Sequence, residues 1–217
     1  GDYIFLLNSD TLLLNNAVKQ FFDFATNQSD GKVACWGTVL QDKEGKTGCS
    51  YGRFPTVLRF IRQWLNHYTL VFGVNIAKYT EGAISPEEFP KKVDFVSGAD
   101  LFIKRSVIEK LGLFNPDFFM YYEETEMQKR YSQAGYGSLV ITSPKIIHLE
   151  GESFRKKRSL NAFRLSVEGS FVYAYNVFSR CSYRLIRILA VVILSPKIIV
   201  YPVALREKLL FFKMLFS

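Results

Sequence analysis

The sequence is poor in cysteine and histidine, with three and two in 217 residues. The cysteines, Cys35, Cys49 and Cys181, are odd in number and show no Cys-x-x-Cys spacing, which excludes a disulfide framework and predicts free thiols in a reducing compartment. Internal repeats and low-complexity segments are missing, and so is any uninterrupted apolar run of about 18–20 residues, the length of a membrane-spanning helix. The 48% hydrophobic and 22% charged residues that are present are typical of a folded domain with an appendage.

The net charge of +8 is unevenly distributed along the chain. Residues 1–150 carry 16 Lys and Arg against 17 Asp and Glu, whereas residues 151–217 carry 12 against 3. The positive excess therefore lies in the last third, which is also strongly apolar. Nucleic-acid domains usually combine basic patches with polar surfaces, while segments that lie on membranes combine basic and apolar ones. We therefore expect no nucleic-acid partner, and a membrane surface as a partner of the tail.

Apolar periodicity and turn residues predict an α/β layer fold up to about residue 155. The pentad Tyr3–Leu7 has the length of a strand covered on both faces, as in parallel sheets. A helix is expected to follow Asp10 and to end near Asn27, and residues 56–72 fit a helix and irregular chain equally well. Further strands are predicted at Val33–Leu40, near Thr47–Tyr51, and at Lys92–Ser97, Asp100–Lys104, Leu139–Thr142 and Lys145–His148, with helices at Ser106–Leu111 and Glu123–Ala134 and a loop at Thr80–Pro90.

Beyond residue 155 the pattern becomes helical, with helices expected at about 160–180, 183–194 and 198–216 and a break at residues 195–197. The run Leu185–Leu194 is apolar apart from Arg187. We therefore divide the chain into an α/β part, residues 1–155, and a basic helical tail, residues 156–217. The tail is predicted to lie in a membrane interface, and packing of its helices on the α/β part or on a second copy is the alternative.

Three polar clusters are candidates for chemistry. Asn8-Ser9-Asp10 follows the first strand directly, and ligands of α/β sheets bind beyond the carboxyl ends of strands. Glu123-Glu124-Thr125-Glu126 opens a helix, and His148 follows two isoleucines. Each cluster also has a purely structural explanation, as a helix cap, as a complement to the helix dipole or as a core histidine. Together they supply a carboxylate base, and Asp and His ligands for Mn²⁺ or Mg²⁺ holding a diphosphate.

The order of these motifs resembles the family 2 glycosyltransferases, and among them bacterial rhamnosyltransferase-type enzymes of surface polysaccharide assembly. The resemblance covers about residues 1–155 and rests on N-S-D-T, V-S-G-A-D-L-F-I-K-R, L-G-L-F-N-P-D-F-F-M-Y-Y-E-E-T-E and I-I-H-L-E-G-E-S. It implies a GT-A fold, with a Rossmann-like mixed sheet flanked by helices, a divalent metal and inverting transfer from a nucleotide-diphosphate sugar. The implied acceptor is a lipid-linked saccharide at the cytoplasmic face of the bacterial inner membrane.

Carried over by position, the resemblance assigns two clusters to the donor diphosphate. Asp10 would bind the metal that bridges the diphosphate, and His148 would complete this metal or diphosphate site. The family often has a second histidine directly after the first, but Leu149 occupies that position here, so one imidazole is available. The residues implied to border the donor and acceptor sites are Asn8, Gly98, Ala99 and Asp100.

The remaining cluster, Glu123-Glu124-Thr125-Glu126, would supply the base. Glu124 is implied to deprotonate the acceptor hydroxyl, with Glu123 as its neighbour and as the alternative base. The family commonly has Glu-Asp where this chain has two glutamates, so the base would be one methylene longer.

Family members normally carry strands and helices that bind the nucleotide base and ribose ahead of the Asn-x-Asp motif. We therefore expect this sequence to be N-terminally truncated relative to a longer enzyme, and to bind the donor poorly by itself. Micromolar binding of a nucleotide sugar in isothermal titration would contradict this expectation. An inactive, glycosyltransferase-like fragment that binds a sugar or a partner is the alternative function.

Overall fold

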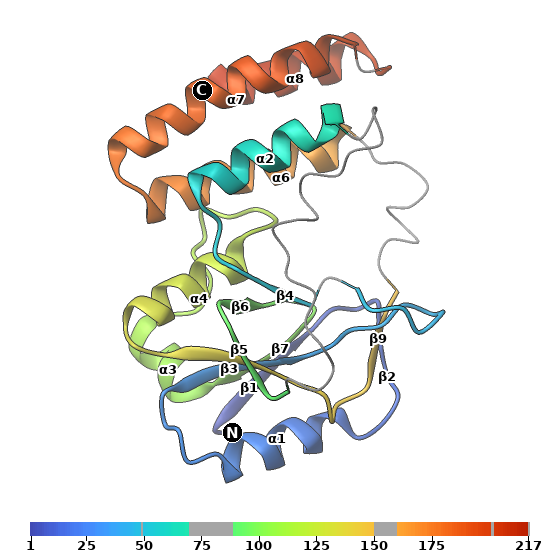
Figure 1. Cartoon of the computed structure of the whole chain (residues 1–217), viewed down its shortest axis with the longest axis vertical. Helices are drawn as coiled ribbons and strands as arrows, with labels where there is room; N and C mark the ends of the chain where they lie inside the picture. The colour runs from blue at the N-terminus through green and yellow to red at the C-terminus, as the bar shows by residue number, and fades with distance from the viewer. Residues whose placement is uncertain (49, 70–88, 150–159, 201, 217) are drawn as a thin grey trace. The chain divides into compact units, whose positions relative to one another are not determined.

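The structure is a computed structural model of the chain, and it describes residues 1–48, 50–69, 89–149, 160–200 and 202–216 (Figure 1). Two compact units make up the chain. The second unit includes segments from before residue 155 as well as the predicted tail. The first comprises Gly1–Phe54, Ile84–Asn115 and Glu124–Lys156, and the second Pro55–Ala83, Pro116–Glu123 and Lys157–Ser217.

Several predictions fall partly outside the described residues. Of the loop predicted at Thr80–Pro90, only Phe89 and Pro90 are described. Cys49 is not described either, whereas Cys35 and Cys181 are free thiols, as predicted.

A five-stranded mixed sheet forms the centre of the first unit, in the order β1-β7-β3-β8-β5. β3 and β8 are parallel, and the other neighbours are antiparallel. The strand predicted at Tyr3–Leu7 is present as β1, but it lies at an edge of the described sheet, and its side chains are half-buried or exposed. The prediction that β1 is covered on both faces, as in parallel sheets, is therefore wrong: β1 is an edge strand that pairs antiparallel with β7. The strands are β1 (Tyr3–Leu7), β3 (Val33–Thr38), β5 (Lys91–Val93), β7 (Asp100–Lys104) and β8 (Gly137–Ile141).

Helices cover both faces of this sheet. Successive side chains of a strand point to opposite faces, so β7 contributes residues to the packing on each face. On one face, Phe102 of β7 packs with Phe21 of the first helix. On the other face, Leu101 and Ile103 of β7 pack with Val107 and with residues of the helix that follows Glu123. Burial on both faces explains the continuous apolar runs of the central strands. The helices of this unit are α1 (Ala17–Asn27), α3 (Arg105–Leu111) and α4 (Glu123–Gln133).

Two short strand pairs complete the first unit. The prediction of a helix directly after Asp10 is wrong, because residues 11–13 form a strand and α1 begins only at Ala17. Asn16 caps α1, since its side chain accepts a hydrogen bond from Lys19 N–H at 3.1 Å. Pairing with a strand near residue 147 overrides the helical spacing of the leucines here. The pairs are β2 (Thr11–Leu13) with β9 (Ile146–His148), and β4 (Tyr51–Gly52) with β6 (Phe95–Val96).

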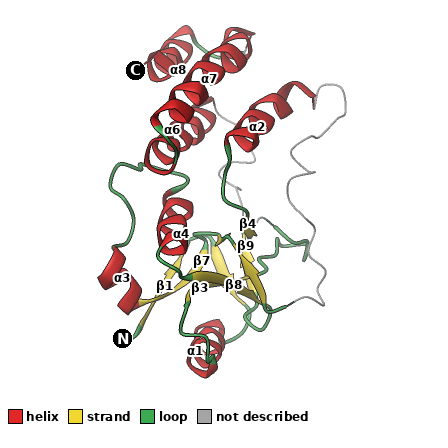
Figure 2. Ribbon diagram, turned by 60° about the vertical axis from the view of Figure 1, so that its left-hand side comes forward, coloured by secondary structure: helices red, strands yellow, loops and turns green. Residues whose placement is uncertain are grey.

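The described elements of the second unit are helices (Figure 2). A single apolar core, which includes Phe60, Trp64, Tyr173 and Phe211, joins them. Of residues 56–72, which the sequence left undecided, residues 57–69 are helical, and residues 70–72 lie outside the described ranges. The helices are α2 (Val57–Thr69), α6 (Leu160–Val177), α7 (Arg180–Val200) and α8 (Leu205–Phe216).

The break predicted at residues 195–197 is wrong, because α7 continues through Pro196 to Val200. A proline inside a helix removes one backbone hydrogen bond. Leu194 and Ile198, on either side of it, are fully buried, and their packing in the core holds the helix together there. Among the described helices, none is both long enough and apolar enough to cross a membrane.

Candidate functional site

The turn after β1 is fixed by backbone hydrogen bonds. Asn8 N–H donates to the Ala99 carbonyl at 3.0 Å, and Thr11 donates its N–H and its hydroxyl to the Asn8 carbonyl at 3.2 and 2.7 Å. Asp10 therefore extends from a fixed turn between β1 and β2. Its side chain is 47% exposed, so the carboxylate is accessible from solvent.

β9 brings His148 to this turn. Thr11 of β2 lies opposite His148 of β9, and Leu149 N–H donates to the Asp10 carbonyl at 2.9 Å. As a result, Asp10 Oδ1 lies 3.2 Å from His148 Nε2, and the Asn8 amide Nδ2 lies 3.5 Å from the same nitrogen. The structure thus brings His148 to Asn8 and Asp10, two predicted site residues that lie far from it in the sequence.

Asp10 and His148 are a suitable pair of ligands for a divalent cation. Carboxylate oxygen suits Mg²⁺ and Mn²⁺, and imidazole nitrogen suits later first-row ions. Adjacent ligands of an octahedral ion with bonds of about 2.1 Å lie about 3 Å apart. The 3.2 Å between Asp10 Oδ1 and His148 Nε2 is close to that separation. In the described part of the chain, no group of three or more His, Cys, Asp or Glu side chains could hold a metal.

The Gly98-Ala99 segment connects this group to Glu124. A Cβ atom added at Gly98 would lie 3.6 Å from both Cβ and Cγ of Glu124. Glu124 Oε1 accepts a hydrogen bond from the Thr125 hydroxyl at 3.3 Å. Ala99 is hydrogen-bonded to Asn8, and the Glu124 side chain lies beside the adjacent Gly98, so this short segment lies between the diphosphate candidates and the candidate base.

Gln128 is a buried residue near the site that the sequence did not single out. Its Oε1 accepts hydrogen bonds from Val96 N–H at 2.9 Å and from the Ser138 hydroxyl at 2.8 Å. Its Nε2 donates to the Val96 carbonyl at 2.8 Å and to the Glu124 carbonyl at 3.1 Å. Gln128 therefore joins the first turn of α4 to β6, just before Gly98. The feature of the sequence that could have identified Gln128 is its position one helical turn after Glu124.

Asp100 lies in the interior of the first unit. Its side chain is fully buried, its Oδ2 accepts a hydrogen bond from Thr38 N–H at 2.6 Å, and its Oδ1 has no partner among the described residues. Burial raises the pKa of the Asp100 carboxyl well above its ordinary value of 3.8, although the hydrogen bond from Thr38 acts in the opposite direction.

Glu123 is half-buried at the start of α4. Its Oε2 is buried and has no hydrogen-bond partner within the described ranges. Burial, and to a smaller degree the charge of Glu123, raise the pKa of the Tyr121 hydroxyl. The two adjacent glutamates therefore differ in their surroundings, since Glu124 contacts Gly98 and hydrogen-bonds Thr125.

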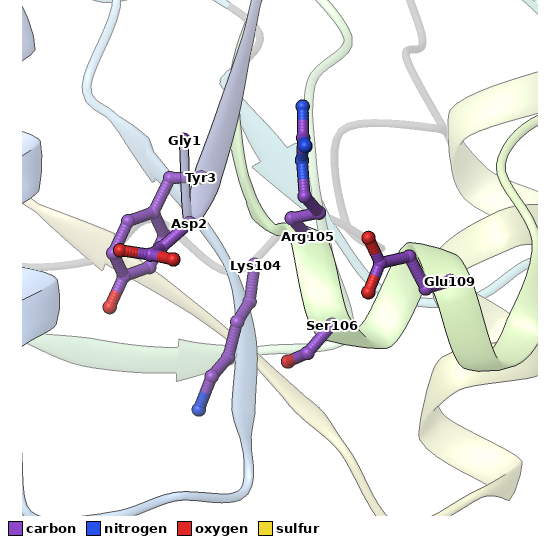
Figure 3. Close-up of a pocket in the computed structure, with 7 residues that line it drawn as sticks. All are labelled: Gly1, Asp2, Tyr3, Lys104, Arg105, Ser106 and Glu109. Carbon is purple, nitrogen blue, oxygen red and sulfur yellow. The ribbon is translucent and has the colours of Figure 1, made fainter.

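A cavity of about 460 Å³ lies at the opposite end of β1 and β7 (Figure 3). In this antiparallel pair Tyr3 lies opposite Lys104, and Leu7 lies opposite Asp100. The cavity is at the Tyr3 end, whereas the candidate site begins at Asn8, beyond the Leu7 end. No predicted site residue lines it; the lining residues are Gly1, Asp2, Tyr3, Lys104, Arg105, Ser106 and Glu109.

Comparison with known proteins gives one sequence relationship. No family model matches the chain. Over 152 residues it is 22% identical to N-acetylglucosaminyl-diphospho-decaprenol L-rhamnosyltransferase of Mycobacterium tuberculosis, in strains CDC 1551 / Oshkosh and ATCC 25618 / H37Rv. The match covers 70% of this chain and 48% of the relative, so the chain spans about half the length of the curated relatives it matches.

Structural comparison gives a second similarity. The chain resembles GalNAc-T7 in a crystal structure with UDP, GalNAc and Mn²⁺, with a TM-score of 0.52 and 14% sequence identity. This match covers 100% of the chain and 38% of the other protein. The predicted fold class, a mixed sheet flanked by helices as in a GT-A glycosyltransferase, is confirmed.

Proposed function

We propose that this chain acts in inverting glycosyl transfer, moving a sugar from a nucleotide-diphosphate donor to a hydroxyl of a lipid-linked saccharide in bacterial surface polysaccharide assembly. The sequence relative is a rhamnosyltransferase, which makes rhamnose the first candidate for the sugar. Similarity of sequence to one glycosyltransferase and of fold to another supports glycosyl transfer as the reaction class.

The proposal rests on the contact of Asp10 with His148 beside the segment that Glu124 touches. Transfer with inversion requires groups that hold a diphosphate and a base positioned to activate an incoming hydroxyl. Asp10 and His148 are 3.2 Å apart, which supports the first requirement. Glu124, whose side chain lies beside Gly98, supports the second.

In the proposed reaction, the Glu124 carboxylate accepts the proton of the acceptor hydroxyl. The hydroxyl oxygen forms a bond to the anomeric carbon as the bond from that carbon to the donor diphosphate breaks. The electron pair of the broken bond leaves with the diphosphate, and the configuration at the anomeric carbon inverts. The Asn8 side-chain amide can donate a hydrogen bond to a diphosphate oxygen, which orients the donor.

Asp10 and His148 would hold a divalent cation, Mn²⁺ or Mg²⁺, at the diphosphate. When bound, such a cation neutralises the charge that develops on the leaving group. The exposure of Asp10 and the 13% exposure of the His148 side chain fit ligands that meet a metal arriving from solvent.

The acceptor and the location also belong to the proposal. The name of the sequence relative specifies a diphospho-decaprenol saccharide as that enzyme's acceptor. We extend this acceptor class to the present chain, together with residence at the cytoplasmic face of the bacterial inner membrane. The excess of Lys and Arg in residues 151–217 supports contact with an anionic lipid surface.

Glu124→Gln tests the base. Glutamine keeps the size of the side chain but cannot accept the proton, so turnover should fall at least about 100-fold while donor affinity is kept. Glu123→Gln is the matched control and should change turnover by only a few-fold. The opposite pattern would assign the base to Glu123, and full activity in both variants would overturn the mechanism.

Asp10→Asn tests the diphosphate site. Loss of the carboxylate charge should raise the Mn²⁺ concentration needed for donor binding by at least about tenfold. Asp23→Asn, which alters an exposed carboxylate on α1, serves as the control and should leave that concentration unchanged. An unchanged metal requirement in Asp10→Asn would remove this residue from the site. Sugar binding without any transfer by the wild-type enzyme would favour the inactive-module alternative instead.

A further inference from the structure

Helix α7 is apolar on two opposite faces. One face is buried in the core of the second unit through Ile186, Ala190, Leu194 and Ile198. The opposite face carries four aliphatic side chains within about 60° of one another at 100° per residue. We call them the α7 stripe; they are Leu185, Ile188, Val192 and Ile199, with exposed fractions of 49%, 61%, 65% and 61%.

We propose that the α7 stripe is the surface by which this protein docks on an anionic lipid bilayer, with α7 lying flat in the interface. Contiguous exposed apolar surface of this kind marks an interaction site in a folded protein. A helix with one apolar face buried in the headgroup region gains hydrophobic energy from that face and electrostatic energy from basic residues beside it. α7 and its neighbour α8 have both properties.

The charges around the stripe favour lipid as the partner. α7 contains four basic residues and no acidic ones. Residues 180–216 together carry seven Lys and Arg against one acid, Glu207. Arg184 of α7 is exposed next to the stripe, and Arg206 and Lys213 of α8 are exposed as well. Basic residues near an anionic bilayer are each attracted to its surface.

Two other cations of α7 are held by groups of the second unit. Arg187 Nη2 donates to the Leu215 carbonyl at 2.8 Å, and its guanidinium lies 4.3 Å from the centre of the Phe171 ring. Lys197 Nζ lies 3.7 Å from the centre of the Phe163 ring. Both charges are therefore held within the second unit, away from the stripe. A flat orientation also avoids placing any of the four charges of α7 at the centre of a bilayer.

The same charges disfavour a second copy of this chain as the occupant. Two copies that met through the α7 stripe would bring two strongly basic helix pairs together, with one acid on each side to offset them. Like charges in close contact oppose association. An anionic bilayer supplies apolar surface and opposite charge together.

Vesicle cosedimentation with the 217-residue chain tests the proposal. The wild type should bind vesicles of equimolar phosphatidylglycerol and phosphatidylcholine, and bind pure phosphatidylcholine vesicles more weakly. Replacing Ile188, Val192 and Ile199 together by serine should reduce binding to the anionic vesicles at least about tenfold, because three inserted aliphatic side chains are lost.

A control removes three exposed aliphatic side chains from the first unit. Leu12, Leu14 and Val18 are 53%, 54% and 48% exposed, and their joint replacement by serine should leave vesicle binding unchanged. Equal binding of wild type and stripe variant, or absence of wild-type binding, would overturn the proposal. Equal losses in the stripe variant and the control variant would also overturn it.

A second measurement leaves the stripe intact. Cys181 is exposed one helical turn before Leu185, on the same face of α7, whereas Cys35 is buried. In a Cys49→Ser background, a polarity-sensitive fluorophore on Cys181 should shift to the blue when anionic vesicles are added. No shift with lipid would overturn the proposal, and so would a lipid-free shift that accompanies dimer formation in sedimentation, because a second copy would then cover the stripe.

The proposed transfer reaction explains why membrane docking would be useful, but the binding tests do not depend on it. They contain neither a sugar donor nor an acceptor, so they can succeed if the chain is inactive. Conversely, Glu124→Gln should bind vesicles like the wild type while losing turnover. A failure of the docking proposal, which would also remove the proposed membrane location, can therefore be distinguished from a failure of the proposed transfer chemistry.

Discussion

At the residue scale, Asp100 shows how a carboxyl group can belong to the interior. It follows Ala99 directly, yet its side chain is fully buried and hydrogen-bonded to the backbone of Thr38. An ionised carboxylate is costly in such a position, which is why burial raises its pKa. Above pH 3.8, the ordinary value, the folded state therefore holds more protons at this site than the unfolded state does. The free energy of unfolding must fall as pH rises from there through the higher pKa of the folded state.

Asp100→Asn should remove this pH dependence. The amide resembles the protonated carboxyl and can still accept the Thr38 hydrogen bond, so the variant should be more stable than the wild type at pH 8 and should differ little from it near pH 4. Urea unfolding at both values measures the difference. Asp23→Asn, an exposed carboxylate on α1, is the control and should stay within about 0.5 kcal/mol of wild type. A loss of stability at pH 8 in Asp100→Asn would contradict this account.

Some residues near the site could be anticipated from the sequence, and others could not. Asn8, Asp10 and His148 occupy motif positions, and the structure places both Asn8 and Asp10 within hydrogen-bond distance of His148. The burial of Asp100 could not be anticipated, because it depends on an N–H group from a strand 62 residues away. The same holds for Gln128, whose four hydrogen bonds involve three separate elements.

At the element scale, α6 packs closely against the segment that precedes α4. A Cβ atom added at Gly169 would lie 2.5 Å from the Tyr121 carbonyl oxygen and 2.9 Å from that of Met120. Both contacts are with backbone atoms, which cannot rotate away as a side chain could. Tyr121 and Tyr122 have positive φ angles of 69° and 70°, so this segment already has a restricted conformation. The glycine therefore permits an approach that any other residue would block.

Gly169→Ala should destabilise the protein by about 1–3 kcal/mol through overpacking. Alanine is favoured over glycine by about 1 kcal/mol in a helix interior, so a net loss can be attributed to the clash. Thermal unfolding measures the change. Gly137→Ala, where no atom lies within 4 Å of the added Cβ, is the control and should show no such loss. A more stable Gly169→Ala variant would contradict the packing seen here.

Elements with strong local signals were predicted well. The helix closed by Gly112, whose φ is 79°, and the helix that begins at Glu123 both formed as expected. Errors arose where distant residues decide the structure. Residues 11–13 are extended because β9 pairs with them, and Pro196 stays helical because its neighbours are held in a core. The helical spacing and the proline signal are local, so they could not reveal either constraint.

At the scale of the whole molecule, each unit has its own apolar core and one of the two tryptophans. Trp36, in β3, belongs to a core of the first unit, and Trp64, in α2, belongs to the core of the second. Each indole is 2% exposed, so its fluorescence should change when its own unit unfolds. The chain therefore contains one natural reporter for each unit.

Single-tryptophan variants can test whether the units unfold independently. In the Trp64→Phe background, Trp36 is the remaining fluorophore. Adding Phe21→Ala there should lower the free energy of unfolding that Trp36 reports by about 3–5 kcal/mol. In the Trp36→Phe background, Trp64 is the remaining fluorophore, and Phe21→Ala should change the free energy of unfolding that it reports much less. Ile198→Ala, in the second core, should show the reverse pattern. Equal shifts of both reporters in guanidinium unfolding would indicate a single cooperative block instead.

The position of the Glu124 side chain beside Gly98 offers a way to change the mobility of this glutamate by substitution. A methyl group at position 98 would meet Glu124 Cβ and Cγ at 3.6 Å, which is an ordinary van der Waals separation. Alanine should therefore fit there, while removing some of the rotamers that the glutamate can now adopt. The freedom of movement of this carboxylate can thus be tuned from a neighbouring backbone position, with its chemical identity left intact.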